Sequence, residues 1–271
     1  MPIALLVDVT NDQVLFAREE SRRFVPASIT KVMTLYHAFE LIDEGKLDPQ
    51  QQFKMNPDTW NEWFRKGSTM FIEAEDQVLV DDLLMGIANV SANDGSIALA
   101  EGQGGTLEAW LDAMNARSRT LGMYDSHFGT PNGWPDDGKT FTTANDLALL
   151  ARALIQKHPG LYARYFGKEG FRYNGFAQAN HDPISGVIDG ADGIKTGYTN
   201  QAGHGFVGSA ERDGTRLIMV VGAVDEEERR ARISRDLISW GFDGFQRRLI
   251  FQENEEVGAA RVQNGDRPAL T

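Results

Sequence analysis

Two pairs of apolar segments, one near each end of the chain, most constrain how this sequence can fold. A short polar turn separates the members of each pair, which is the pattern of a β-hairpin. The pairs occupy residues 3–9 with 14–17 and residues 205–211 with 215–224. Because strands stand at both ends of the chain, we expect one antiparallel sheet of about five strands that contains both hairpins.

The middle of the chain shows helical periodicity instead, with apolar residues recurring three and four positions apart. Helices are expected over residues 28–42, 80–88, 107–120 and 145–155, and a charged amphipathic helix over residues 226–248. The sequence therefore predicts an α/β fold in which helices flank the sheet and a helical subdomain is inserted between its strands.

The pattern weakens after Arg248. A polar run precedes a short expected strand at residues 257–262 and a turn at residues 264–266. A segment of this length cannot bury a core of its own. We therefore expect one domain over residues 1–251 and a tail over residues 252–271.

Charge and composition exclude several classes of function. The 39 acidic and 27 basic side chains give a net charge of -12, which opposes a polyphosphate backbone, so no nucleic-acid partner is expected. Cysteine is absent, which excludes disulfides and a thiolate nucleophile. The five histidines include no His-x-x-x-His pair, so we expect no metal, and no cofactor is indicated.

No targeting or membrane-spanning segment is recognisable. Residues 1–8 contain no cationic region, and no apolar run approaches the roughly 18 residues that span a bilayer. The sequence as given is expected to be soluble.

The first candidate for chemistry is Ser28-Ile29-Thr30-Lys31, at a helix start marked by Pro26. Positions i and i+3 share a helix face, so the Lys31 amine can lie beside the Ser28 hydroxyl. A serine becomes a good nucleophile when a base takes its proton, and a lysine can be that base if burial or nearby cations lower its pKa. The alternative is an ordinary helix start with a solvated lysine.

Two further motifs gain meaning from their order. Ser91-Ala92-Asn93 offers a hydroxyl and an amide, although alone it is a common turn. Lys195-Thr196-Gly197 opens an apolar strand and offers a cation, a hydroxyl and a backbone that a ligand can approach, although alone it is a strand-edge turn. The three motifs together form one constellation. Ser-x-x-Lys comes first, Ser-x-Asn follows about sixty residues later, and Lys-Thr-Gly follows about a hundred residues after that.

With these motifs in this order, the chain resembles the low-molecular-mass penicillin-binding proteins of the D-alanyl-D-alanine carboxypeptidase family, in the serine DD-peptidase and β-lactamase superfamily. The resemblance runs from about residue 3 to residue 251 and includes residues 26–34, 91–94, 127–128, 192–199 and 239–242. It implies that the enzyme removes the terminal D-Ala from peptidoglycan stem peptides through an acyl-enzyme, and that penicillin and other β-lactam antibiotics acylate the same serine.

The resemblance also implies a role for each motif residue. Ser28 would be the acylated nucleophile and Lys31 its base, while Ser91 and Asn93 would relay a proton and contact the substrate amide. The residues implied in substrate binding are Lys195, Thr196, Gly197, Tyr198 and Arg230.

Three of these residues have finer assignments. The backbone N–H groups of Ser28 and Tyr198 would form the oxyanion hole. Arg230, chosen over its neighbours Arg229 and Arg232 by alignment back from Trp240, would help to hold the terminal carboxylate. His181 is a further candidate, since a basic residue ahead of the Lys-Thr-Gly strand lies near the cleft in relatives.

The chain departs from the family in several places. Ala92 replaces a frequent glycine, which leaves both functional side chains in place, and Tyr198 stands where relatives can carry a histidine, which puts the pH profile and deacylation rate in question. The family usually has a signal peptide, a β-rich second domain and an amphipathic anchor. None is complete here, so we interpret residues 252–271 as the start of a missing second domain. We expect a monomer with no membrane contact of its own. Its expected location is the bacterial periplasm or the outer cell wall.

One competing motif indicates a nucleotide hydrolase. Residues 133–140, Gly-Trp-Pro-Asp-Asp-Gly-Lys-Thr, match a phosphate loop letter by letter, and the apolar strand ending at Asp225 imitates its usual partner. A phosphate loop binds through backbone N–H groups between a strand and a helix. Pro135 removes one donor, and Asp136 and Asp137 place negative charge in the cradle, so we disfavour this function.

Proteins of different function can carry the same serine and lysine motifs. A β-lactamase or an esterase can carry Ser-x-x-Lys, but the chain between Ser91 and Lys195 has no Glu-x-x-x-Asn sequence of the kind that positions a deacylating water in class A β-lactamases. A non-catalytic cell-wall-binding module would have no use for the intact set of serines, lysines and asparagine.

Overall fold

One antiparallel sheet of five strands organises the chain, as predicted. The computed structural model describes residues 3–245, 251, 255–258, 260–261 and 269–270. The strands lie in the order β2-β1-β9-β8-β7, so the first hairpin pairs directly with a strand from more than two hundred residues later. Their bounds are Ile3–Asp8 (β1), Gln13–Arg18 (β2), Ala191–Thr199 (β7), Gly203–Arg212 (β8) and Thr215–Val224 (β9).

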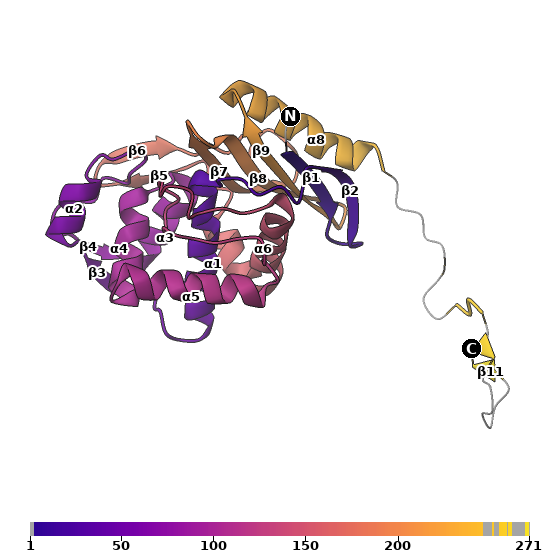
Figure 1. Cartoon of the computed structure of the whole chain (residues 1–271), viewed down its shortest axis with the longest axis horizontal. Coiled ribbons are helices and arrows are strands. Elements are labelled where there is room, and N and C mark those ends of the chain that lie inside the picture. The colour runs from indigo at the N-terminus through magenta and orange to yellow at the C-terminus, as the bar shows by residue number, and fades with distance from the viewer. Residues whose placement is uncertain (1–2, 246–250, 252–254, 259, 262–268, 271) are drawn as a thin grey trace.

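The central strands are buried on both faces. Helix α8 (Glu227–Asp243) covers one face, and the helical subdomain lies against the other (Figure 1). Along β1 the side chains alternate, with Ile3 and Leu5 in the larger core and Ala4 and Leu6 in the core beneath α8. A strand that must be apolar on both faces appears in the sequence as a continuous apolar run, which is why β1 and β9 were recognisable.

The main helices of the subdomain were predicted within a few residues. They are α1 (Lys31–Asp43), α3 (Val80–Asn89), α5 (Leu107–Thr120) and α6 (Ala144–Lys157). Two boundaries were wrong. The helix expected from residue 28 begins with a turn of 3-10 helix, Ala27–Thr30, and the last helix ends at Asp243 rather than at 248, a position outside the described residues.

Several further elements were not predicted. They are α2 (Pro57–Trp63), α4 (Asn93–Gly104) and α7 (Pro159–Tyr165), with the hairpins β3 (Gln52–Lys54) with β4 (Gln77–Leu79) and β5 (Gly170–Tyr173) with β6 (Phe176–Ala179). Helix α4 is buried on every side over its first eight residues, so no polar face produces a helical period. Its Gly102 also lies directly against the Phe53 ring, where a methyl group would collide.

The described part of the tail contains one short strand pair. Strand β10 (Ala260–Arg261) lies within the expected strand at 257–262 and pairs with β11 (Ala269–Leu270). The expected turn at 264–266 is outside the described residues. The boundary at residue 251 stays a prediction.

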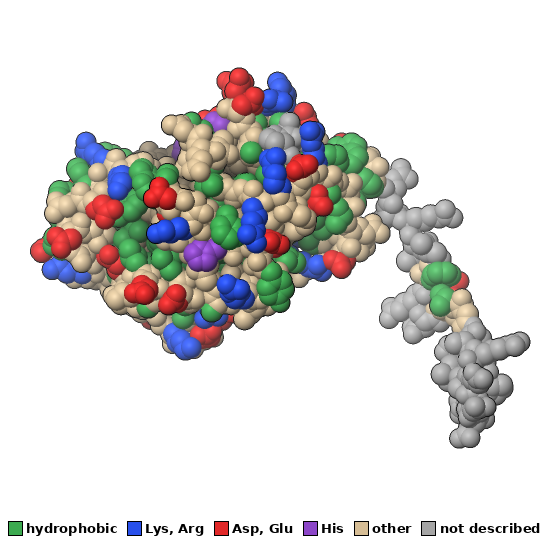
Figure 2. All heavy atoms as spheres, viewed as in Figure 1, with side chains coloured by type: hydrophobic (Ala, Val, Ile, Leu, Met, Phe, Trp, Pro, Cys, Tyr) green, Lys and Arg blue, Asp and Glu red, His purple; other side chains and the backbone are tan. Residues whose placement is uncertain are grey.

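The described surface carries charges of both signs. Acidic and basic side chains are interspersed over the face shown in Figure 2. Among the described residues, no helix is both long and apolar enough to cross a membrane.

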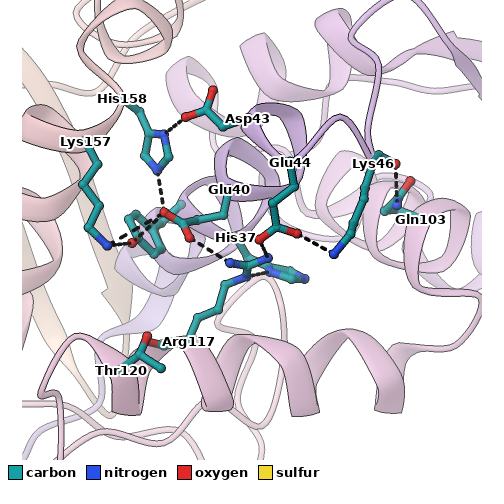
Figure 3. A network of polar contacts seen from close by, with 11 residues as sticks. His37, Glu40, Asp43, Glu44, Lys46, Gln103, Arg117, Thr120, Lys157 and His158 are labelled. Carbon is teal, nitrogen blue, oxygen red and sulfur yellow. Dashed lines mark hydrogen bonds and ion pairs between the residues drawn. The ribbon is translucent and has the colours of Figure 1, made fainter.

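A polar network fixes helix α1, whose first residue is Lys31 (Figure 3). From α5, the Arg117 guanidinium donates to His37 Nδ1 at 2.8 Å, to Glu40 at 2.8 Å and to Glu44 at 2.7 Å. At the end of α6, His158 contacts Glu40 Oε1 at 3.0 Å through Nε2. Three helices are thereby held at one place.

The His37 imidazole in this network makes stability depend on pH. Burial, and then the Arg117 charge, lowers the pKa of His37 from 6.5 to about 4. Between these two values the unfolded chain takes up a proton that the native protein does not, so stability falls as the pH drops through this window. We predict that between pH 7 and about pH 4.5 wild type loses about 2 kcal/mol more unfolding free energy than His37→Gln.

Urea unfolding at the two pH values measures this difference. Glutamine retains an oxygen that can accept the Arg117 N–H but does not titrate. Equal losses in wild type and variant would show that other groups control the acid sensitivity.

Candidate active site

Ser28 is presented by a sharp turn of the backbone. It lies in the 3-10 turn Ala27–Thr30 immediately before α1, between the sheet and the helical subdomain. Ala27 has φ +50°, in the left-handed region that side chains other than glycine rarely occupy. Strained backbone of this kind persists where the surrounding structure imposes it, and it is frequent at functional sites.

Lys31 brings three segments of the chain together. Its Nζ lies 3.0 Å from Ser28 Oγ, 2.8 Å from Asn93 Oδ1 and 2.6 Å from the carbonyl oxygen of Asn132. The side chain is completely buried. Burial lowers the pKa of Lys31 well below its usual value, and the Lys195 charge lowers it further, against the opposing effect of Asp94.

The Ser91-x-Asn93 motif forms the junction between α3 and α4. Ser91 has φ +60° and is buried at the cleft, and Asn93 is the first residue of α4. The Asn93 amide donates to the carbonyl oxygen of Lys66 at 3.0 Å, and its backbone N–H donates to that of Ser68 at 2.8 Å. The residues before α3 therefore hold the Asn93 side chain in the orientation in which Oδ1 faces Lys31.

Two glycines allow the surrounding backbone to approach the Ser28 turn. A Cβ on Gly197, in β7, would overlap the carbonyl oxygen of Pro26 and lie 3.1 Å from the Ile29 nitrogen. A Cβ on Gly133 would overlap the carbonyl oxygen of Ala27. The glycine of the Lys-Thr-Gly motif therefore has a packing requirement in addition to any contact with a ligand.

The β7 end of the cleft is rich in cations. Burial, and then the Arg230 charge, lowers the pKa of Lys195 to about 7, while Asp182 opposes this shift. Arg230 is only 4% exposed, donates to Glu227 Oε1 at 3.1 Å and has an Nε with no hydrogen-bond partner among the described residues. Its neighbour Arg229 instead pairs with Asp225.

Two more residues of this end have defined positions. The Tyr198 ring stacks on His204 with centroids 4.1 Å apart, and its hydroxyl donates to Asn200. His181 lines the same cleft, and burial and the Lys195 charge lower its pKa.

The structure thus brings most of the sequence-predicted residues to one cleft of about 630 Å³. Those that line it are Ser28, Ser91, Asn93, Thr196, Gly197, Tyr198 and Arg230, and the buried Lys31 and Lys195 adjoin them. A cavity of about 730 Å³ at the other end of the sheet, lined by Asp8 and Phe242 among others, contains neither a serine nor a lysine among its described lining residues.

Sequence reasoning missed the wall formed by Gly67, Ser68, Asn132 and Trp134. The available signal was the Asn-Gly pair at 132–133. Asn132 directly precedes the segment that matches a phosphate loop, and Gly133 is the first residue of that segment. That segment does not follow a strand, as a phosphate loop does. In a phosphate loop the hydroxyl at the position of Thr140 would face a metal ion, but here the Thr140 hydroxyl donates to Asp136 at 2.6 Å. The geometry agrees with the rejection of a phosphate loop.

No group of three or more His, Asp or Glu side chains in the described part of the chain is arranged to hold a metal ion. The chemistry that this cleft can perform with its own residues is nucleophilic attack by a serine beside a buried lysine.

Comparison with known proteins agrees with this chemistry. A family model described as D-alanyl-D-alanine carboxypeptidase matches residues 2–225. The chain is 34% identical over 267 residues to the D-alanyl-D-alanine carboxypeptidase DacD of Escherichia coli, covering 97% of this chain and 68% of that protein.

Solved structures with the same fold include penicillin-binding protein 5 of Haemophilus influenzae, with a TM-score of 0.89 and 31% identity over 99% of this chain and 78% of the other. Penicillin-binding protein D2 of Listeria monocytogenes, in its ampicillin-bound form, has a TM-score of 0.77 and 27% identity over 89% of this chain and 97% of the other. The predicted fold and the predicted serine-type D-Ala-D-Ala carboxypeptidase are thereby confirmed, and the chain belongs to the D-alanyl-D-alanine carboxypeptidase family.

Proposed function

We propose that Ser28 attacks the peptide bond between the two D-alanines of a peptidoglycan stem peptide, with Lys31 as its general base. The geometry around Lys31 Nζ supports this most directly. A neutral amine has two N–H donors and one lone pair, and two of its three neighbours, Asn93 Oδ1 and the Asn132 carbonyl, can only accept. The lone pair then faces the Ser28 hydroxyl, the neighbour that has a proton to give.

The reaction proceeds in two halves. The Ser28 oxygen bonds to the carbonyl carbon as its proton passes to Lys31, and the C–N bond breaks as the leaving amine of the terminal D-Ala takes up a proton. Water then attacks the acyl-enzyme, which releases the shortened peptide and restores the Ser28 hydroxyl. In each half of the reaction, the backbone N–H groups of Ser28 and Tyr198 donate hydrogen bonds to the carbonyl oxygen and stabilise the negative charge that forms on it.

The remaining motif residues act on proton transfer and on the substrate's carboxylate. Ser91 and Asn93 form a path between Lys31 and the leaving amine. Lys195, Thr196 and Arg230 bind the C-terminal carboxylate, which pairs with two buried cations and a hydroxyl. The observation that favours Arg230 over Arg229 is its burial in the cleft wall, since Arg229 lies outside that lining.

The substrate class also suggests a location and a class of inhibitor. Peptidoglycan is built outside the cytoplasmic membrane, so we infer a periplasmic or outer cell-wall enzyme that acts as a monomer. β-Lactams are inferred to acylate Ser28, because their strained amide resembles the D-Ala-D-Ala bond and a 27% identical relative of the same fold is known with ampicillin bound.

Acylation by penicillin identifies the nucleophile. Intact-protein mass spectrometry after incubation with benzylpenicillin is expected to show one adduct, which maps to the peptide that contains Ser28 and is missing in Ser28→Ala. Labelling that persists in Ser28→Ala would place the nucleophile elsewhere.

Lys31→Arg tests the base. Arginine keeps the positive charge but cannot deprotonate, so the acylation rate is expected to fall by at least roughly 10²–10⁴-fold. The acylation rate of Lys31→Met, which removes the charge and preserves the apolar stem, is expected to fall by a similar factor. Thermal unfolding of both variants shows whether they fold. Acylation of folded Lys31→Arg at the wild-type rate would make the lysine purely structural.

The pKa of Lys195 predicts the alkaline limb of the activity profile. A cation whose pKa is about 7 loses its charge as the pH rises above that value, and with it the attraction for the substrate carboxylate. We expect kcat/KM for a D-Ala-D-Ala peptide to fall above about pH 7 in wild type, and the fall in Lys195→Arg to begin at higher pH because the guanidinium stays charged. A profile of kcat/KM against pH for both proteins measures this. Identical alkaline limbs would assign the titration to another group.

A further inference from the structure

The Asp94 carboxylate is a buried acidic group that the mechanism above does not use. It directly follows Asn93 at the start of α4 and is only 2% exposed. Among the described residues its hydrogen-bond donors are backbone N–H groups, those of Gly95 at 2.9 Å and Met70 at 3.0 Å to Oδ1, and that of Ile72 at 3.2 Å to Oδ2. A carboxylate held by backbone donors keeps its net negative charge inside the protein.

Two of these donors belong to a stretch of backbone that forms part of the cleft wall. We call residues 66–72, between α2 and β4, the wall segment, and its Gly67 and Ser68 line the cleft. The wall segment forms neither helix nor strand, and both Gly67 and Phe71 have positive φ, +68° and +63°. Its N–H groups therefore need acceptors from elsewhere in the chain, and Asp94 provides them.

Asn93 binds the same segment through its carbonyl groups. The Asn93 backbone N–H donates to the carbonyl oxygen of Ser68 at 2.8 Å, and its side-chain amide donates to that of Lys66 at 3.0 Å. Asn93 and Asp94 together therefore bind alternate positions of the wall segment, residues 66, 68, 70 and 72. The amide that donates to Lys66 is the one whose Oδ1 faces the Lys31 amine at 2.8 Å, so the wall segment and the base are joined through one side chain.

The Asp94 charge also acts on Lys31. Burial and the Lys195 charge from β7 lower the pKa of Lys31, whereas the Asp94 charge from α4 raises it. Burial raises the pKa of Asp94 itself, and the N–H groups of the wall segment oppose that shift. On the β5 side, burial and nearby carboxylates raise the pKa of Tyr173 to about 12, so this hydroxyl stays neutral near pH 7.

We propose that Asp94 is a positioning residue for the general base: its carboxylate holds the wall segment against Asn93, which directs Oδ1 at Lys31, and its charge raises the proton affinity of Lys31. The inference rests on the proposed function, in which Lys31 takes the proton of Ser28. Burial keeps the amine neutral but also makes it a weaker base. Asp94 offsets part of that loss, and a general base works best when its pKa lies near the operating pH.

Asp94→Asn tests both parts of the proposal. Asparagine has nearly the same shape, but it has no charge and its amide nitrogen cannot accept an N–H. The rate of acylation by benzylpenicillin, measured against pH, is expected to fall at its maximum by roughly tenfold to a hundredfold, because displacing a catalytic group by about an ångström costs about a hundredfold. The acid limb, where Lys31 becomes protonated, is expected to move to lower pH by roughly one unit, because the charge that favours the protonated amine is removed.

Asp94→Glu separates the geometry from the charge. Glutamate keeps the negative charge, but its extra methylene displaces the two oxygens from the N–H groups of the wall segment. The maximal acylation rate is therefore expected to fall, while the acid limb is expected to stay at the wild-type pH.

The matched control is Asp146→Asn, which changes another buried carboxylate in the same way. Asp146 is 5% exposed and accepts from the Asp125 N–H at 3.0 Å and the Ser126 hydroxyl at 2.7 Å, but it does not line the cleft. This variant is expected to unfold at a lower temperature than wild type and to keep the wild-type acylation rate and acid limb. Thermal unfolding of every variant shows whether it is folded.

A wild-type acylation rate in folded Asp94→Asn would overturn the proposal, and so would a reduced rate with an unmoved acid limb, because that is the result of a purely structural role. Should Asp94→Asn not fold, a wild-type rate in Asp94→Glu would overturn it instead. Failure of the proposed function would look different, since wild type itself would neither be acylated nor release D-Ala from a D-Ala-D-Ala peptide.

Discussion

The complete burial of the Lys31 amine is the constraint on which the rest of the site depends. A charged ammonium without a carboxylate partner is costly to bury, whereas a neutral amine needs only two acceptors and one donor. The fold supplies two carbonyl oxygens, those of the Asn93 amide and the Asn132 backbone, and the Ser28 hydroxyl. These groups come from the 3-10 turn before α1, from α4 and from the segment that follows α5, so all three must be docked around Lys31 for its amine to have these partners. The form of Lys31 that burial favours is thus also the form that can take a proton.

Docking the sheet against the helical subdomain requires backbone contact at Ser28. The 3-10 turn that carries Ser28 is packed by Gly197 of β7 and by Gly133, and neither position has room for a methyl group. Close packing of this kind makes the position of Ser28 depend on both halves of the molecule rather than on its own helix. The left-handed backbone at Ala27 and Ser91 lies at the same junction, where surrounding contacts can impose it. The Arg117 network in Figure 3 fixes the other end of α1, so the helix is held at two places.

The sequence predicted what depends on local pattern and missed what depends on distant contact. The bounds of α5, residues 107–120, follow from apolar periodicity on one face. Helix α4 was missed because burial on all sides removes that periodicity. Ser28 and Lys31 are three residues apart, so their proximity was readable, but the contact of Lys31 with Asn132 spans 101 residues and had no local signal. The segment beginning at Gly133 was considered only as a phosphate loop, and its role as a cleft wall emerges from packing against Ala27 and Gly67.

Lys31 and Lys195 show how surroundings, rather than residue type, assign a role. Both side chains are buried and both have a lowered pKa, chiefly because of burial. Each also lies within the field of one aspartate, Asp94 for Lys31 and Asp182 for Lys195, so the difference is one of position. Lys31 contacts the Ser28 hydroxyl, whereas Lys195 lies at the end of the cleft that a carboxylate would enter under the proposed function. A bound carboxylate favours the charged form of Lys195, and the charge on Lys195 disfavours a proton on Lys31. Under the proposed function, the cation that binds the substrate carboxylate therefore also helps to keep the general base neutral.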